Sequence, residues 1–120
     1  MHSNHFKTKV MHKENQEIIN QLIECATECN HCYSECLNEK DVTMMARCIE
    51  LDRDCADICQ LTASMLARGS EQGQQLLKVC ADVCNTCAEE CAKHDHEHCK
   101  HCSEVCYKCA ESCLTYEPVN

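Results

Sequence analysis

Apolar residues recur along most of this chain at alternating steps of three and four, and cysteine fills a large share of these positions. The cysteines fall into four groups, at residues 25–36, 48–59, 80–91 and 99–113. Steps of three and four keep residues on one face of an α-helix, whereas a half-buried strand requires steps of two. The chain contains no Cys-x-Cys pair. The pattern therefore predicts four helices, each of which buries a face made largely of cysteine.

Three short polar breaks separate the predicted helices, at residues 38–41, 68–70 and 94–96. The candidate helix caps are Asp41, Ser70 and Asp95 at helix starts and Gly69 at a helix end. Short connections favour antiparallel neighbours. We therefore predict an all-α fold over residues 14–117, an antiparallel up-down-up-down four-helix bundle with a cysteine-lined core. Residues 1–13 lie outside the pattern and are predicted to form a flexible N-terminal arm or a short peripheral helix.

The composition narrows the classes of protein that the sequence can belong to. Its 120 residues include 16 cysteines but only two glycines, one proline, three tyrosines and one phenylalanine. So few turn residues argue against a loop-rich disulfide scaffold and against a Gly-rich phosphate loop. The formal net charge of −9 argues against a nucleic-acid partner. Since no stretch has the length and apolarity of a secretion signal or a membrane span, we expect a cytoplasmic protein with reduced thiols and no membrane partner.

Seven pairs of cysteines stand four residues apart, a spacing that favours metal binding over disulfide formation. On a helix such side chains share one face, with Cβ atoms about 5–6 Å apart, whereas a disulfide needs about 3.5–4.5 Å. Two sulfurs at this spacing can close around a metal ion without distorting the helix. The pairs are Cys25/Cys29, Cys32/Cys36, Cys55/Cys59, Cys80/Cys84, Cys87/Cys91, Cys102/Cys106 and Cys109/Cys113, and Cys48 and Cys99 remain outside them.

The buried charge distinguishes between the metals that thiolates bind. A Zn²⁺ ion bound by four thiolates leaves a net charge of about −2 at each site. Soft Cu⁺ can instead bind at a ratio close to one ion per thiolate, which leaves the buried core with almost no net charge. We therefore predict that the chain stores or sequesters many Cu⁺ ions and that it is not an enzyme. The alternatives are a zinc or iron–sulfur module, a thiol/disulfide redox protein, disulfide-stapled helical hairpins, metallothionein-like disorder and an inert cysteine core.

The up-down order of the helices predicts two chemically different ends. One end, which we call the mouth, collects Cys36, Met44, Met45, Cys91, His94, His96, His98, Cys99 and His101. The other end, the plug, collects Ile18, Leu22, Met65, Leu66, Leu76, Leu77, Leu114 and Tyr116. We predict that copper enters at the mouth and that at least one of His94, His98 and His101 binds it. Met44 and Met45 fit either a ligand or a core role.

The second cysteine group lacks one position of the buried face. Between Cys48 and Cys55 this position falls at Leu51 or at Asp52, depending on the register of the helix. If Asp52 takes it, a buried acid there requires a metal or a cationic partner. If Leu51 takes it, Asp52 is an ordinary surface charge.

Three segments resemble the cytosolic branch of the bacterial copper storage proteins. They are CATECNHCYSEC at 25–36, CIELDRDCADIC at 48–59 and CAKHDHEHCKHCSEVC at 91–106. The resemblance implies a homotetramer of four-helix bundles that each store many Cu⁺ ions through Cys-x3-Cys units, with a copper chaperone as a candidate partner. It also implies that a histidine of HDHEH and Asp52 lie near the mouth. Ile18, Leu22 and Leu77 hold positions that can be cysteine in relatives, which predicts a lower capacity towards the plug.

Overall fold

The structure is a computed structural model that describes the backbone of residues 2–117 and the side chains of residues 15–117. Its elements are α1 (His2–Leu37), the short 3₁₀ helix η1 (Val42–Met45), α2 (Ala46–Ala67), α3 (Glu71–Cys91) and α4 (Glu97–Thr115). Within this described part there is no strand. The all-α prediction is therefore confirmed.

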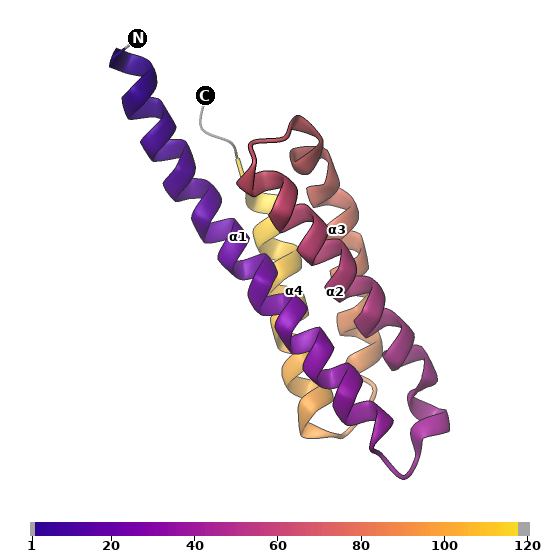
Figure 1. The fold of residues 1–120 in the computed structure, drawn as a ribbon. Helices are drawn as coiled ribbons and strands as arrows, with labels where there is room; N and C mark the ends of the chain where they lie inside the picture. Colours follow the sequence, from indigo (N-terminus) through magenta and orange to yellow (C-terminus); the bar gives the residue numbers. More distant parts are fainter. Residues whose placement is uncertain (1, 118–120) are drawn as a thin grey trace.

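The four long helices form an up-down-up-down bundle, as predicted. In Figure 1, α1 descends from the N-terminus, α2 rises beside it, α3 descends again and α4 rises towards the C-terminus. Each helix packs against two neighbours, α1 and α3 each contacting both α2 and α4. This square arrangement lets one face of every helix point at a shared axis, so that the cysteine faces meet along it.

Helix α1 is longer than its partners and extends beyond them (Figure 1). Its 36 residues begin at His2, so the backbone of residues 2–13 continues the first helix of the bundle. Met1 lies outside the described residues. The boundary at residue 13 between an arm and the bundle stays a prediction.

The turn between α2 and α3 follows the predicted capping pattern. Gly69 has φ 71°, in the left-handed region that glycine adopts without steric cost. Its N–H donates to the carbonyl of Leu66 at 3.0 Å, and the N–H of Ser70 donates to that of Met65 at 3.0 Å, which satisfies the last carbonyls of α2. Ser70 is the N-cap of α3, as predicted.

The other two predicted caps do not begin the long helices. Asp41 precedes the short η1 instead of α2. Asp95 as the cap of α4 is wrong, because His96 is the extended residue there and its carbonyl accepts from the N–H groups of Cys99 and Lys100. The side chain of His96 is held by carboxylates of the connection between α1 and η1, with Nδ1 at 3.2 Å from Glu39 Oε2 and Nε2 at 3.4 Å from Asp41 Oδ1.

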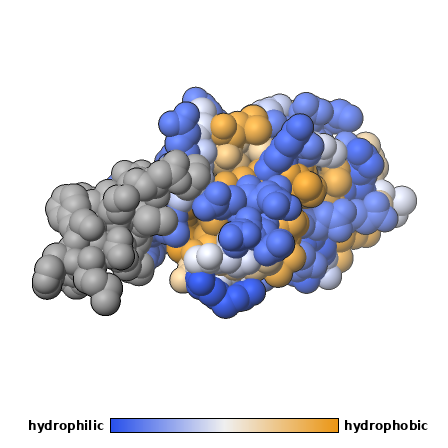
Figure 2. Space-filling model, turned by 90° about the horizontal axis from the view of Figure 1, so that it is seen from above, coloured by the Kyte–Doolittle hydropathy of each residue, from blue (hydrophilic) through white to orange (hydrophobic). Residues whose placement is uncertain are grey.

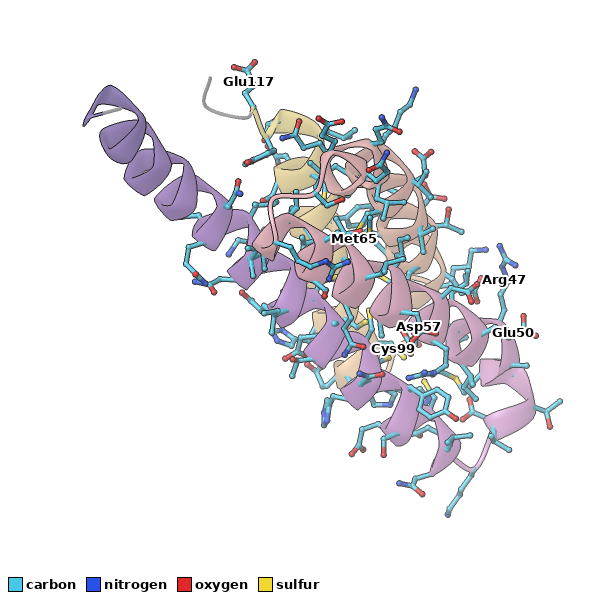
Figure 3. All side chains as sticks on the ribbon, turned by 45° about the horizontal axis from the view of Figure 1, so that its top comes forward. Arg47, Glu50, Asp57, Met65, Cys99 and Glu117 are labelled. Atoms are coloured by element: carbon cyan, nitrogen blue, oxygen red, sulfur yellow. The ribbon has the colours of Figure 1, made fainter. Side chains whose placement is uncertain are left out.

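The core is built mainly from thiols. All sixteen cysteines are free and buried, and alanines from all four helices lie beside them in the same core. Sulfur atoms, yellow in Figure 3, lie between the four ribbons. Seen from above, the outer surface is mostly hydrophilic with apolar patches between the polar side chains (Figure 2). Among the described helices, none combines the length and the apolarity that crossing a membrane requires.

Candidate metal site

One layer of the core brings together a sulfur from each of the four helices. Cys25 Sγ of α1 lies 3.8 Å from Cys55 Sγ of α2, 4.0 Å from Cys84 Sγ of α3 and 3.8 Å from Cys106 Sγ of α4. Cys55 Sγ in turn lies 3.5 Å from Cys84 Sγ. Because the alternating steps of three and four aim every cysteine at the common axis, the four faces stack their sulfurs into one column.

Four of the seven Cys-x3-Cys pairs hold their two sulfurs at contact distance. Their sulfurs are 3.8 Å apart in Cys32/Cys36, 4.0 Å in Cys80/Cys84 and in Cys87/Cys91, and 3.9 Å in Cys102/Cys106. These separations exceed the S–S bond of about 2.05 Å. They are also shorter than twice a metal–sulfur bond of about 2.3 Å, so both sulfurs of a pair can bind one ion.

Neighbouring sets of atoms that could hold a metal ion share members along the column. One set joins Cys25 and Cys55 with Cys59 and Cys84, and a second joins Cys25 and Cys55 with Cys29 and Cys106, with all atoms of a set within 4.8 Å of one another. Cys29 and Cys106 recur in a third set with Cys87 and Cys102. A shared thiolate can bridge two ions, so the arrangement favours multinuclear clusters over isolated sites.

Asp52 lies on the thiol axis, which resolves the choice of register between Leu51 and Asp52. The Asp52 side chain is fully buried, and its Oδ1 accepts from the thiols of Cys87 at 3.3 Å and Cys102 at 3.5 Å, while Oδ2 accepts from Cys48 at 3.8 Å. Burial, together with the neighbouring Cys102, Cys87 and Cys48, raises the pKa of Asp52 to about 11. The carboxyl is therefore neutral at pH 7 in the metal-free protein and can serve as an oxygen ligand only after losing its proton.

At the mouth, His98 is the predicted histidine that reaches the thiols. Its side chain is 10% exposed. Nδ1 lies 3.5 Å from the sulfurs of both Cys32 and Cys99, and Nε2 lies 3.3 Å from Glu39 Oε1. A histidine held by a carboxylate on one nitrogen and facing thiols with the other is a typical oriented metal ligand. Cys32, Cys36, His98 and Cys99 form a set whose ligand atoms lie within 4.8 Å of one another.

The other predicted histidines and methionines of the mouth differ in their burial and in their partners. His94 Nε2 is 3.0 Å from Glu90 Oε2, and the half-exposed His101 lies 3.6 Å from Glu28 Oε2. Met45 is fully buried, whereas Met44 is 73% exposed. Copper binding by these residues stays a prediction.

Sequence reasoning missed the carboxylates that surround the mouth. Glu90 is 8% exposed and bridges α2 and α3, since its Oε1 lies 3.4 Å from Arg47 Nε and 3.3 Å from Lys93 Nζ. Glu39 contacts the stacked rings of His96 and His98, whose centroids are 5.3 Å apart. Glu90 immediately precedes Cys91 and Glu39 lies in a connection, so the helical period gave no signal for either.

The plug is smaller than predicted. Ile18, Leu22, Leu66 and Leu77 are buried, and Tyr116 packs partly buried against them. Met65, which Figure 3 labels, and Leu76 are partly buried. Placing Leu114 in the plug was wrong: it is 60% exposed, because it follows Cys113 by one residue and therefore lies about 100° around the helix from the buried face.

Comparisons with known proteins agree with this site. The model of the copper storage protein family matches residues 11–118. The cysteine-rich protein YhjQ of Bacillus subtilis is 41% identical over 89 residues, which cover 74% of this chain and 82% of that protein. The Cu(I)-bound copper storage protein BsCsp3 is 40% identical and superposes with a TM-score of 0.82, over 86% of this chain and 97% of that one.

A second solved structure, from a different organism, is equally similar in fold. A cytosolic copper storage protein of Streptomyces lividans, described during copper loading with five coppers, is 37% identical with a TM-score of 0.82. The similarity covers 88% of this chain and 93% of that chain. Because the family match and these relatives span most of its length, the chain belongs to the copper storage protein family.

Proposed function

We propose that this chain stores Cu⁺ by holding many ions on the column of sulfurs along its bundle axis. The observation that carries the proposal is the layer that contains one sulfur from each of the four helices. In this layer the sulfurs of Cys55, Cys84 and Cys106 all lie within 4.0 Å of Cys25 Sγ. Soft thiolates bind Cu⁺, as they also bind zinc and iron–sulfur clusters, in preference to hard cations such as Mg²⁺ and Ca²⁺. A load near one ion per thiolate also compensates the negative charge that metal binding creates in the buried core.

Storage, and not catalysis, is the role that this arrangement supports. A catalytic metal site keeps an open position for substrate next to a placed acid or base. In this chain the cysteine sulfurs are buried and face one another, so the ligand atoms serve the ions and leave no position for a substrate. We assign the chain no enzymatic activity.

We place the protein in the cytoplasm and expect it to assemble as a homotetramer. The Streptomyces relative is described as cytosolic, and reduced thiols persist in that compartment. The tetramer rests on the family resemblance. The candidate partner is a copper chaperone that delivers Cu⁺ at the mouth. The carboxylates and histidines around His98 give this surface the negative charge that a positively charged partner surface would complement.

Titration of the reduced, metal-free protein with Cu⁺ against a competing chelator tests the proposal. We expect saturation above about four ions per chain, the number that sixteen thiols would give in Cys₄ sites, and a helical circular dichroism spectrum before and after loading. Saturation at four or fewer ions would refute storage and favour a zinc-like module. Loss of helix on full reduction would favour disulfide-stapled hairpins.

Loading kinetics test the role assigned to the mouth. Replacing His94, His98 and His101 together should slow copper uptake by about tenfold while final capacity stays nearly unchanged. His98→Ala alone should account for most of this effect, because the His98 ring contacts both Cys32 and Cys99. Stopped-flow absorbance of the copper–thiolate bands measures the rate. His101→Ala, which removes a half-exposed ring, is the matched control. If the His98→Ala variant takes up copper at the wild-type rate, His98 does not act in copper entry at the mouth.

A further inference from the structure

A surface cavity reaches the thiol column at the end opposite the mouth. Between α3 and α4 lies a surface cavity of about 350 Å³, lined by Gln74, Leu77, Lys78, Cys113, Leu114 and Tyr116. Cys113 is 4% exposed, whereas every other cysteine is 0% exposed. The cavity therefore lies over the one thiol with measurable exposure to solvent.

Cys113 belongs to the column and is not an isolated thiol. Its contacts with Cys109 and Cys80, together with burial, raise the pKa of the Cys113 thiol. Cys80 Sγ in turn lies 3.7 Å from Cys59 Sγ and 4.0 Å from Cys84 Sγ. An ion that Cys113 shares with Cys80 can thus pass to Cys59 or Cys84, the next sulfurs towards the mouth, by a single ligand exchange.

The charge around the cavity differs from the charge around the mouth. The mouth carries buried or half-buried carboxylates, among them Glu39, Glu90 and Asp41, which attract cations and repel anions. The cavity is walled by Leu77, Leu114 and Tyr116, and Lys78 is the one charged residue among those that line it. On a chain of net charge −9, Lys78 thus places one positive charge at the rim of the cavity that holds the 4%-exposed Cys113.

We propose that this cavity is an exit port at which a small anionic thiol, a thiol that carries carboxylates, removes Cu⁺ from the closed end of the column. The inference rests on the proposed function, copper storage. The carboxylate of the small thiol pairs with Lys78 while its sulfur reaches the ion at Cys113. A new Cu–S bond forms to the incoming thiolate, the bond between copper and Cys113 Sγ breaks, and the released Cys113 thiolate takes up the proton that the small thiol lost. Copper remains Cu⁺ throughout, so no oxidant or reductant is needed.

The first experiment tests the port without copper. The reduced, metal-free full chain is pulsed with substoichiometric iodoacetamide, and the modified cysteines are identified by peptide mass spectrometry. We expect Cys113 to react first and about tenfold faster than Cys109, its neighbour one turn earlier, because reactivity follows exposure. Leu114→Trp, which fills the rim of the cavity, should slow the reaction of Cys113. Equal rates for Cys113 and Cys109, or faster reaction of Cys36 or Cys99 at the mouth, would overturn the port.

The second experiment measures copper removal from the loaded full chain. Glutathione serves as the anionic thiol and 2-mercaptoethanol as the neutral one. Lys78→Glu should slow transfer to glutathione by about fivefold and leave transfer to 2-mercaptoethanol unchanged, since a charge at the rim of a binding site acts mainly on the association rate of charged ligands. Lys108→Glu, the same charge reversal at an exposed lysine of α4, is the control.

The two proposals fail in different ways. If Lys78→Glu and Lys108→Glu release copper to glutathione at the same rate, the exit port is wrong while storage stands. If the chain saturates at four or fewer ions, storage is wrong, yet the alkylation of Cys113 still reports whether the cavity gives access to the column.

Discussion

Asp52→Asn is expected to remove about 3 kcal/mol of pH dependence, between pH 5 and pH 7, from the stability of the metal-free protein. The pKa of Asp52 is raised from 3.8 to about 11 by burial and by the surrounding thiols, so the folded chain holds this proton where the unfolded chain has released it. The unfolded state then binds fewer protons than the folded state, and the free energy of unfolding falls as pH rises through this window, by about 1.4 kcal/mol per pH unit. Asparagine carries no proton to lose and should not show this slope.

The measurement is urea unfolding of the reduced, metal-free proteins at several pH values in this range. Asp54→Asn, which changes an exposed carboxylate of the same helix, is the matched control and should keep the wild-type slope. The comparison of variants cancels the titration of the other carboxylates. If wild type and Asp52→Asn show the same slope, Asp52 is ionised in the folded protein and the burial argument fails.

The protonated state of Asp52 bears directly on copper storage. In the metal-free protein a neutral carboxyl avoids an unpaired buried charge beside Cys48, Cys87 and Cys102. When Cu⁺ displaces the thiol protons, the carboxyl can lose its own proton and help to balance the incoming positive charge. We therefore predict that Asp52 takes part in copper binding because of its position on the thiol axis, in spite of being an oxygen donor beside a soft metal.

The sequence was sufficient to predict the bundle and the thiol column. Cysteines at steps of three and four can share a buried face only on a helix, and the short breaks favour antiparallel neighbours. The register around Asp52 could not be predicted, because a step of seven from Cys48 to Cys55 keeps both flanking cysteines buried whether Leu51 or Asp52 lies between them. Only packing against the other helices rotates α2 so that Asp52 meets the thiols of α3 and α4.

The periodicity describes the two ends only in part. Topology groups residues by height along the bundle, and height alone places Leu114 in the plug, whereas the helical period, one residue after Cys113, already turns it towards solvent. Glu90 is the opposite case, because the same period turns it away from the cysteine face although it is buried. Residues in connections, such as Glu39, meet the histidines through loop geometry that no helical period encodes.

Leu22→Ala should lower the free energy of unfolding of the metal-free protein by about 2–5 kcal/mol. Leu22 is fully buried on α1, one turn before Cys25, where the column of thiols gives way to ordinary apolar side chains. Truncation removes buried methyl groups and leaves a cavity that neighbouring side chains fill only in part. Urea unfolding under reducing conditions measures the loss, and Cu⁺ titration of the same variant should give the wild-type capacity, since no sulfur is removed.

Ile23→Ala is the matched control, because Ile23 is the next residue of the same helix and is 50% exposed. Its truncation should change the free energy of unfolding by no more than about 0.5 kcal/mol. The comparison of the two variants tests whether the plug, and not the thiol column, supplies most of the hydrophobic stabilisation of the metal-free bundle. Each cysteine buries a small side chain, so the thiol column gives little hydrophobic stabilisation for its length, and the leucines and isoleucines of the plug must supply it before copper is bound. If Leu22→Ala and Ile23→Ala unfold at the same urea concentration, the metal-free thiol column stabilises the bundle without the plug.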